Sequence, residues 1–177
     1  IIGVLIEGLF LFGSFGYVGA FLRDRFNLPY VTIGIMLGGF GVGGLIYSAS
    51  VRWLIRQLGE QRMILLGGCL MALGNLTIAF SQIWLLFIPV SLVMGLGFYM
   101  LHSTLQTQAT ELSPESRGTA VSLFAFSLFM GQGIGVAVLG RVVDTAGYVP
   151  CFVVAGVAIA VLAVWLVTQL RRLSAQP

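Results

Sequence analysis

The stretch Leu105–Gly140, LQTQATELSPESRGTAVSLFAFSLFMGQGIGVAVLG, joins a short charged segment to a long apolar one. Glu111, Glu115 and Arg117 crowd the first part, whereas residues 118–140 carry no charge. A helix rises about 1.5 Å per residue, so this uncharged run is long enough to cross a hydrocarbon core about 30 Å thick. The stretch therefore predicts a charged connection followed by a membrane-spanning helix.

The composition of the whole chain extends this prediction. Of its 177 residues, 58% are hydrophobic and 8% are charged, whereas soluble domains contain about 25% charged residues. This balance is typical of a polytopic membrane protein. The net charge of +3 comes from arginines spread over several connections, so it indicates membrane topology and not a nucleic-acid-binding patch.

The fold expected from this pattern is all-α, with six transmembrane helices in a single bundle over residues 1–177. The predicted spans cover about 2–21, 31–50, 63–80, 83–106, 118–139 and 148–170. Charged residues, prolines and glycines separate them. Ser113 and Pro114 predict a helix N-cap followed by proline at the first helical position, which opens the fifth span.

An even number of spans places both ends of the chain on one side of the membrane. The expected connections on that side contain Arg52, Arg56, Arg62, Arg117, Arg171 and Arg172, and the opposite connections contain Arg23, Arg25 and Arg141. Arginine is more frequent in cytoplasmic loops, so both termini are expected in the cytoplasm. Residues 171–177 would then form a cytoplasmic tail.

The chain also contains an internal echo. Residues 52–59 read RWLIRQLG and residues 140–147 read GRVVDTAG, and each segment has a charge three residues before its final glycine. The match predicts two three-helix repeats, one over about 1–80 and the other over about 83–170. Three spans are an odd number, so the repeats are inverted in the membrane, which is a hallmark of secondary transporters.

Several motifs carry a resemblance to a known family. They are YMLHSTLQ at 99–106, ELSPESRGTA at 111–120, GQGIG at 131–135, and the G-x-x-x-D-x-x-G spacing of Gly140, Asp144 and Gly147. With them the chain resembles the carboxy-terminal six-helix half of a major facilitator superfamily transporter, and within that family the bacterial sugar-efflux and drug-efflux permeases. Nearly the whole chain takes part in the resemblance.

The sequence departs from the family pattern at two places. Thr145 replaces a basic residue of the loop motif, and in the first loop Arg52 and Arg56 stand in its glycine and aspartate slots. A salt-bridge role of that aspartate therefore does not carry over to position 56.

The resemblance implies one of two six-helix bundles that alternate access to a small-molecule substrate, with protons as a possible second cargo. The implied partners are the lipid bilayer of a bacterial inner membrane and a missing amino-terminal six-helix half. The Gly140, Asp144 and Gly147 motif would lie in a periplasmic loop. No cofactor and no nucleic acid are implied. The chain opens Ile-Ile without methionine, so we expect a fragment or a natural half-transporter.

By the same resemblance the first and fourth spans line a central cavity, and the residues support this independently. Each span carries a polar stripe on one helix face: Tyr99, His102, Ser103 and Gln106 at i, i+3, i+4 and i+7, and Glu7, Ser14 and Tyr17 at i, i+7 and i+10. Polar groups find no partners in lipid, so both stripes are expected to face protein or a wet cavity.

Glu7 is the only acidic residue inside a predicted span, which makes it a candidate proton carrier. The simpler alternative is that Glu7 extends to the cytoplasmic surface or pairs locally. His102, the only histidine, could bind substrate or share a proton with Glu7 if their helices face each other. Its simpler alternative is a satisfied interfacial histidine. A metal site is not expected, because no second ligand lies at a suitable spacing.

The remaining candidates are structural. Ser127, Gly131 and Gly135 form a small-residue stripe that predicts close helix packing, Gly34, Gly38 and Gly41 do the same on the second span, and Gln132 could reach across a helix interface. On the cytoplasmic side, Arg56, Glu60, Glu111 and Arg117 could form a charge network that latches one conformation. Plain topology-setting charge is the alternative.

Two other function classes stay open. A channel or a non-transporting membrane scaffold would not need the two polar stripes to meet. A membrane enzyme such as an intramembrane serine protease needs a serine and a histidine on different helices. Here the histidine adjoins Ser103 on one helix, where neighbouring side chains do not face each other, so no enzyme is expected.

Overall fold

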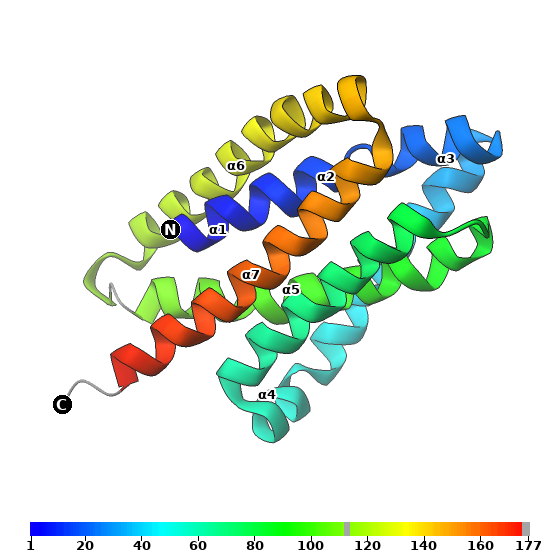
Figure 1. The fold of residues 1–177 in the computed structure, drawn as a ribbon. Coiled ribbons are helices and arrows are strands. Elements are labelled where there is room, and N and C mark those ends of the chain that lie inside the picture. The colour runs from blue at the N-terminus through cyan, green and yellow to red at the C-terminus, as the bar shows by residue number, and fades with distance from the viewer. Residues whose placement is uncertain (112–113, 175–177) are drawn as a thin grey trace.

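The computed structural model describes residues 1–111 and 114–174, and over these ranges every regular element is a helix. The elements are α1 (Ile2–Glu7), the π-helical segment η1 (Gly8–Phe12), α2 (Gly13–Phe15), α3 (Val18–Phe26), α4 (Tyr30–Phe80), the short 3₁₀ turn η2 (Trp84–Leu86), α5 (Phe87–Glu111), the 3₁₀ turn η3 (Pro114–Ser116), α6 (Arg117–Ala146) and α7 (Tyr148–Ser174). Figure 1 shows them as one elongated bundle.

Five helical stretches of the described chain are long and apolar enough to cross a membrane: Ile2–Phe26, Tyr30–Phe80, Trp84–Glu111, Pro114–Ala146 and Tyr148–Arg172. The prediction of an all-α polytopic membrane protein is therefore confirmed. The predicted N-cap at Ser113 and the last tail residues, 175–177, lie outside the described residues. Of that predicted junction, Pro114 belongs to η3, and α6 begins at Arg117.

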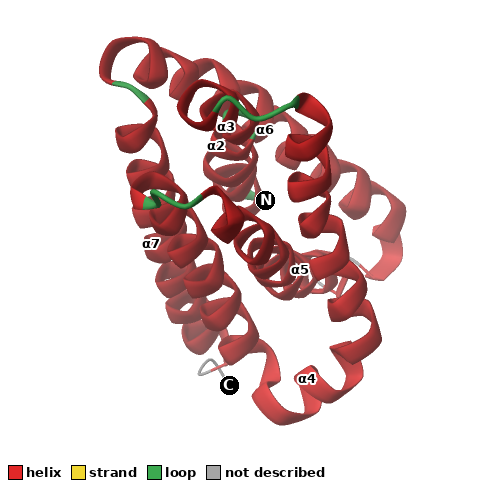
Figure 2. Cartoon of the chain, turned by 90° about the vertical axis from the view of Figure 1, so that its right-hand side faces the viewer, coloured by secondary structure: helices red, strands yellow, loops and turns green. Residues whose placement is uncertain are grey.

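The predicted second and third spans, 31–50 and 63–80, belong to a single helical element. α4 runs for 51 residues and leaves helical geometry at Gly59, where φ is 69° and ψ is 168°. There it turns back on itself, as Figures 1 and 2 show. The predicted connection between these spans is thus helical almost throughout, because residues 52–58 contain no helix breaker.

The predicted periplasmic loop motif is also mostly helical, so its assignment to a loop is wrong for Gly140 and Asp144. α6 continues through both residues to Ala146, and only Gly147 leaves the helix, with φ 88° and ψ −179°. α7 begins at the next residue. Gly59 and Gly147 occupy matching places in the internal echo, and both adopt the same backbone conformation.

This conformation gives a stability prediction for Gly147. Its φ and ψ lie in a region open almost only to glycine, where another residue costs about 1–3 kcal/mol. Apart from its two chain neighbours, no described residue has an atom within 4 Å of a Cβ placed there, so the backbone alone decides the outcome. We expect Gly147→Ala to lower the free energy of unfolding in detergent micelles by about 1–3 kcal/mol.

The matched control is Gly118→Ala, because Gly118 also has open space around its Cβ position but lies in regular helix. Alanine favours a helix over glycine, so this variant should be at least as stable as the parent. Equal stability of the two variants would contradict the strain assigned to Gly147.

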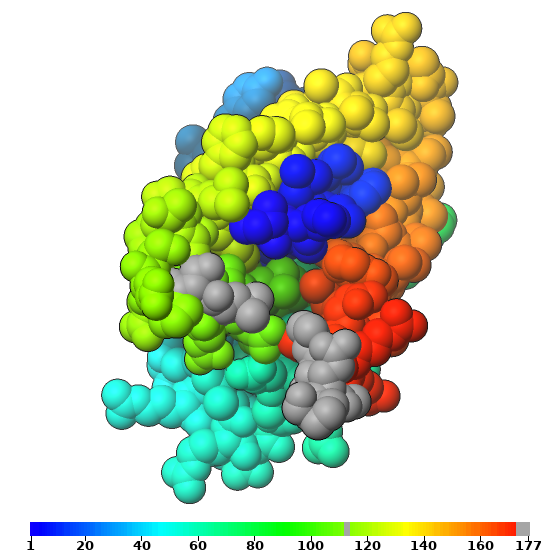
Figure 3. Space-filling model, turned by 90° about the vertical axis from the view of Figure 1, so that its left-hand side faces the viewer, coloured from blue at the N-terminus to red at the C-terminus, as the bar shows by residue number. Residues whose placement is uncertain are grey.

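The first membrane-spanning stretch is interrupted, unlike the single span predicted at 2–21. α1 is followed by the π-helical segment and by α2, and the chain then turns at Tyr17 before α3 continues to Phe26. Figure 3 shows this first stretch, in blue, between α6 in yellow-green and α7 in orange and red.

Glycines allow α6 and the first stretch to touch backbone to backbone. A Cβ at Gly131 would overlap the carbonyl oxygen of Leu5, and one at Gly135 would overlap that of Leu9. From the other side, a Cβ at Gly8 would overlap the carbonyl oxygen of Leu128. Buried Ser127 completes this stripe of α6 and donates to the Leu123 carbonyl at 2.8 Å.

The packing role predicted for Gly34, Gly38 and Gly41 is wrong within this chain. All three are exposed, and a Cβ at any of them would meet nothing within 4 Å. The contact to α5 is made instead by other glycines of α4, among them Gly39 and Gly43. Gly39 and Gly43 lie one and five positions after Gly38, and residues at these spacings point to a different side of a helix. Only one face of the glycine-rich run of α4 therefore packs inside the bundle.

The α6 stripe yields a second stability prediction. In Gly135→Ala the new methyl group collides with the backbone of Leu9, which cannot move as a side chain can. Overpacking of this kind costs about 1–3 kcal/mol. We expect a corresponding loss in the free energy of unfolding of the detergent-solubilised protein, whereas Gly133→Ala, two residues away and in open space, should show no loss. Unchanged stability of Gly135→Ala would refute the close backbone contact.

Candidate functional site

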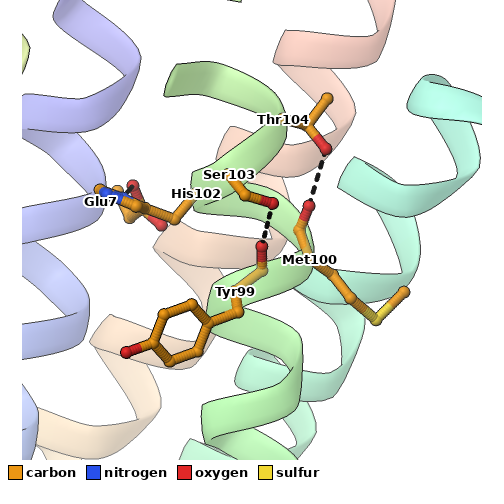
Figure 4. Close-up of polar contacts among 6 residues, drawn as sticks. All are labelled: Glu7, Tyr99, Met100, His102, Ser103 and Thr104. Carbon is orange, nitrogen blue, oxygen red and sulfur yellow. Dashed lines mark hydrogen bonds and ion pairs between the residues drawn. The ribbon is translucent and has the colours of Figure 1, made fainter. Parts of the chain in front are cut away.

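The site is centred on Glu7, the last residue of α1 before the π-helical segment. Its side chain is completely buried. Oε2 lies 3.0 Å from Nδ1 of His102 on α5, whereas Oε1 has no hydrogen-bond partner among the described residues. Figure 4 shows the two side chains meeting between their helices. The structure thus brings together the acid and the histidine that the sequence singled out.

Two aromatic rings fix the orientation of the imidazole. Phe98, one turn earlier on α5, stacks on His102 with ring centroids 4.6 Å apart and an interplanar angle of 27°. Phe124 of α6 approaches at 5.0 Å and 60°, edge to face. The His102 side chain keeps 14% exposure. The pair is therefore a proton donor and acceptor enclosed by apolar walls, in which electrostatic interactions are strong.

Ser14 does not point toward this pair. Its buried hydroxyl lies 3.0 Å from Oδ1 of Asn75 on α4 and 2.7 Å from the carbonyl oxygen of Phe10. Asn75 is itself buried, and its amide donates to the Met71 carbonyl at 3.1 Å. The sequence reasoning missed Asn75, although an amide inside the apolar run 63–80 is a detectable signal.

Tyr17 points to a third neighbour, because its hydroxyl donates to the Val136 carbonyl of α6 at 2.7 Å. The prediction that Glu7, Ser14 and Tyr17 share one helix face is therefore wrong. The reason is the interruption of the helix. A π-helical segment winds more residues per turn than an α-helix, and the turn at Tyr17 rotates the chain again.

The polar stripe of α5 divides in a similar way. His102 faces α1, whereas Ser103 pairs with the hydroxyl of Tyr47 on α4 and donates to the Tyr99 carbonyl at 2.5 Å. The Tyr99 ring, 37% exposed, stacks on the Tyr47 ring with centroids 6.1 Å apart. The role of Tyr47 was not predicted from the sequence, because a single tyrosine in an apolar span does not by itself indicate a functional residue.

Two amides of the predicted pathway are half-buried. The structure gives neither Gln106 of α5 nor Gln132 of α6 a side-chain hydrogen bond to another described residue. The backbone of Gln132 lies against Gly8, one residue beyond Glu7. The fold thus places Gln132 close to the Glu7–His102 pair. Gln106 lies one helical turn after His102 on α5.

The predicted network of Arg56, Glu60, Glu111 and Arg117 does not form among the described residues. All four side chains are exposed, and no ion pair joins them. Glu60 instead accepts a hydrogen bond from Gln108 Nε2 at 2.6 Å. The physical reason is that exposed ion pairs are worth only about 0–1 kcal/mol, so nothing holds these long side chains together. Over the described ranges no three His, Cys, Asp or Glu residues come together as metal ligands.

Comparisons with known proteins agree with this architecture. The family model described as Major Facilitator Superfamily matches residues 1–177. An uncharacterized MFS-type transporter, YfkF of Bacillus subtilis (strain 168), is 30% identical over 104 residues, which are 58% of this chain and 26% of that protein. The class G tetracycline resistance protein of Vibrio anguillarum is 30% identical over 141 residues, covering 73% of this chain and 36% of that protein.

An uncharacterized transporter of Buchnera aphidicola subsp. Baizongia pistaciae (strain Bp) is 27% identical over 133 residues, which are 75% of this chain and 32% of that protein. The chain therefore spans between about a quarter and about a third of the curated relatives it matches. No solved structure matches it. The family match over the full chain confirms the resemblance carried by the motifs, and the chain belongs to the major facilitator superfamily.

Proposed function

We propose that this chain is the carboxy-terminal half of a transporter that exports a sugar or a drug-like molecule by alternating access, driven by protons. The family and the relatives named as transporters support transmembrane transport over catalysis. The relative named as a tetracycline resistance protein supports a drug-like substrate. The observation that carries proton coupling is the buried Glu7–His102 pair.

The pair can couple a proton to helix movement. When Glu7 is ionised and His102 is protonated, their attraction in an apolar site holds α1 against α5. A proton added at Oε1, which has no hydrogen-bond partner among the described residues, turns Glu7 into a neutral carboxylic acid. The attraction then falls and the two helices can separate. Loss of that proton on the other side of the membrane would restore the pair.

The arrangement of the chain supports the proposed half-transporter. The matching conformations of Gly59 and Gly147 fit inverted repeats over about 1–80 and 83–170. Gly34, Gly38 and Gly41 leave a smooth exposed face on α4 that an amino-terminal half could cover. Arginine is more frequent in the connections expected on the same side of the membrane as the two termini. This excess supports cytoplasmic termini in the inner membrane.

Within this proposal the candidate pathway narrows. Among the predicted pathway residues, Tyr99, Ser103, Gln106 and Gln132 keep some exposure and are not tied to the buried first stretch, so we assign substrate contact to them. Ser14 and Tyr17 bind Asn75 and the Val136 carbonyl, so we assign them to holding the interrupted first stretch in place. A channel or scaffold would gain nothing from a completely buried carboxyl group, which disfavours both alternatives.

The first functional prediction concerns Glu7→Gln. Glutamine keeps the size and one hydrogen-bonding oxygen but cannot bind and release a proton. In everted vesicles that contain the intact protein, addition of tetracycline or lactose should release protons with the parent, and Glu7→Gln should abolish that release. A pH-sensitive fluorescent dye measures it, and the amount of protein in the membrane should stay the same.

The matched control is Glu115→Gln, which removes an exposed carboxylate of η3 that is not part of the buried pair. This variant should couple as the parent does. Proton release that persists in Glu7→Gln at the parent rate would rule out Glu7 as the proton carrier.

The second functional prediction concerns the histidine. His102→Ala leaves Glu7 buried without its partner, and breaking a buried charge pair costs about 3–5 kcal/mol. We expect a loss of that order in the free energy of unfolding and a loss of coupled transport. Adding Glu7→Gln to His102→Ala should recover part of the stability, because the unpaired charge is then absent. A retained transport rate in His102→Ala would make His102 a packing residue.

A further inference from the structure

An open pocket lies one helical turn from the Glu7–His102 pair. It has a volume of about 380 Å³ at the end of the bundle where α1 begins and α7 finishes. The residues that matter for access are Val4, Leu105, Ala109 and Phe124 in its wall, and Gln108 and Gln169 supply its polar groups. Val4 lies three residues before Glu7, and Leu105 lies three residues after His102. The pocket therefore points at the pair along both helices.

Phe124 lies between this pocket and the pair. Phe124 lines the pocket and at the same time contacts the His102 ring, with centroids 5.0 Å apart. It is only 2% exposed, and it packs in a small cluster with Val4 and Leu128, to which Leu105 and Ala109 also belong. Water that entered the pocket would thus meet an apolar wall before it reached Glu7.

The position of Phe124 depends on how α6 packs against the first stretch. Phe124 is on α6, whereas Glu7 and His102 are on α1 and α5. The contact between α6 and the first stretch includes backbone against backbone at Gly131 and Gly135, alongside side-chain packing of Val4 against Phe124 and Leu128. Small residues let the two backbones approach closely, and a shift of α6 would move Phe124 away from the imidazole.

We propose that Phe124 is a positioning and sealing residue: it orients His102 toward Glu7 and closes the pocket against the pair. When α6 moves, the seal opens, and the free oxygen of Glu7 becomes accessible to water from that end of the bundle. The consequence for transport rests on the proposed function, because only a proton-coupled transporter needs access to the pair from one side at a time. The seal itself is a property of the fold.

The sole histidine of the chain provides a direct probe. Diethyl pyrocarbonate modifies accessible imidazoles, and mass spectrometry of the peptide that contains His102 measures the rate. The experiment uses the intact, membrane-inserted protein. The parent should react slowly, because the side chain keeps 14% exposure. Phe124→Ala should react about tenfold faster, and Phe124→Leu, which keeps apolar bulk, should return toward the parent rate.

Two further variants separate a local seal from general loosening. Phe152→Ala removes an equally buried ring of α7 that touches neither the pocket nor His102, and it should react at the parent rate. Ala109→Trp fills the pocket, so adding it to Phe124→Ala should slow the reaction again. If Phe124→Ala does not accumulate, Phe124→Val takes its place in both comparisons.

Three results would overturn the inference: a parent-like rate in Phe124→Ala, an equal acceleration in Phe152→Ala, or no slowing by Ala109→Trp. None of these measurements involves transport. A failure of the Glu7→Gln transport test would therefore refute proton coupling without touching the seal, and an unchanged labelling rate would refute the seal without touching proton coupling.

Discussion

A carboxyl group in the middle of an apolar bundle is the constraint on which the site depends. Glu7 is completely buried, and a charge there is costly unless it is paired. Its partner comes from a helix 95 residues later in the chain, so α1 and α5 must meet at one depth. Phe98 and Phe124 then set the angle of the imidazole. Satisfying this one side chain therefore constrains how α1, α5 and α6 meet.

The glycine stripes of α6 and α4 differ in whether they help to build this site. Close backbone packing of α6 on the first stretch, at Gly131 and Gly135, brings Phe124 near enough to reach His102. The exposed Gly34, Gly38 and Gly41 of α4 lie against nothing in the part of the chain that the structure describes. A glycine stripe in a membrane helix therefore indicates a close approach, but the partner depends on which side of the helix faces the bundle.

Much of the fold could be predicted from sequence, and the reason is the strength of the signals. Long uncharged runs predict membrane helices, and Glu7 and His102 stood out because acids and histidines are rare in such runs. The shared face of Glu7, Ser14 and Tyr17 could not be predicted, since a π-helical segment leaves no clear mark in composition. Asn75 and Tyr47 became visible only when the fold supplied their partners.

The chain reverses direction at Gly59 and at Gly147, and these two places show which residue of the repeated motif determines the backbone conformation. At position 56 this chain has arginine, and at the matching position 144 it has aspartate, yet both segments remain helical up to the following glycine. Neither charge takes part in an ion pair within the described residues. Gly59 and Gly147 nevertheless adopt the same backbone conformation, which other residues rarely reach. In this chain the glycine therefore defines the reversal, and the charge three residues earlier is free to vary in sign.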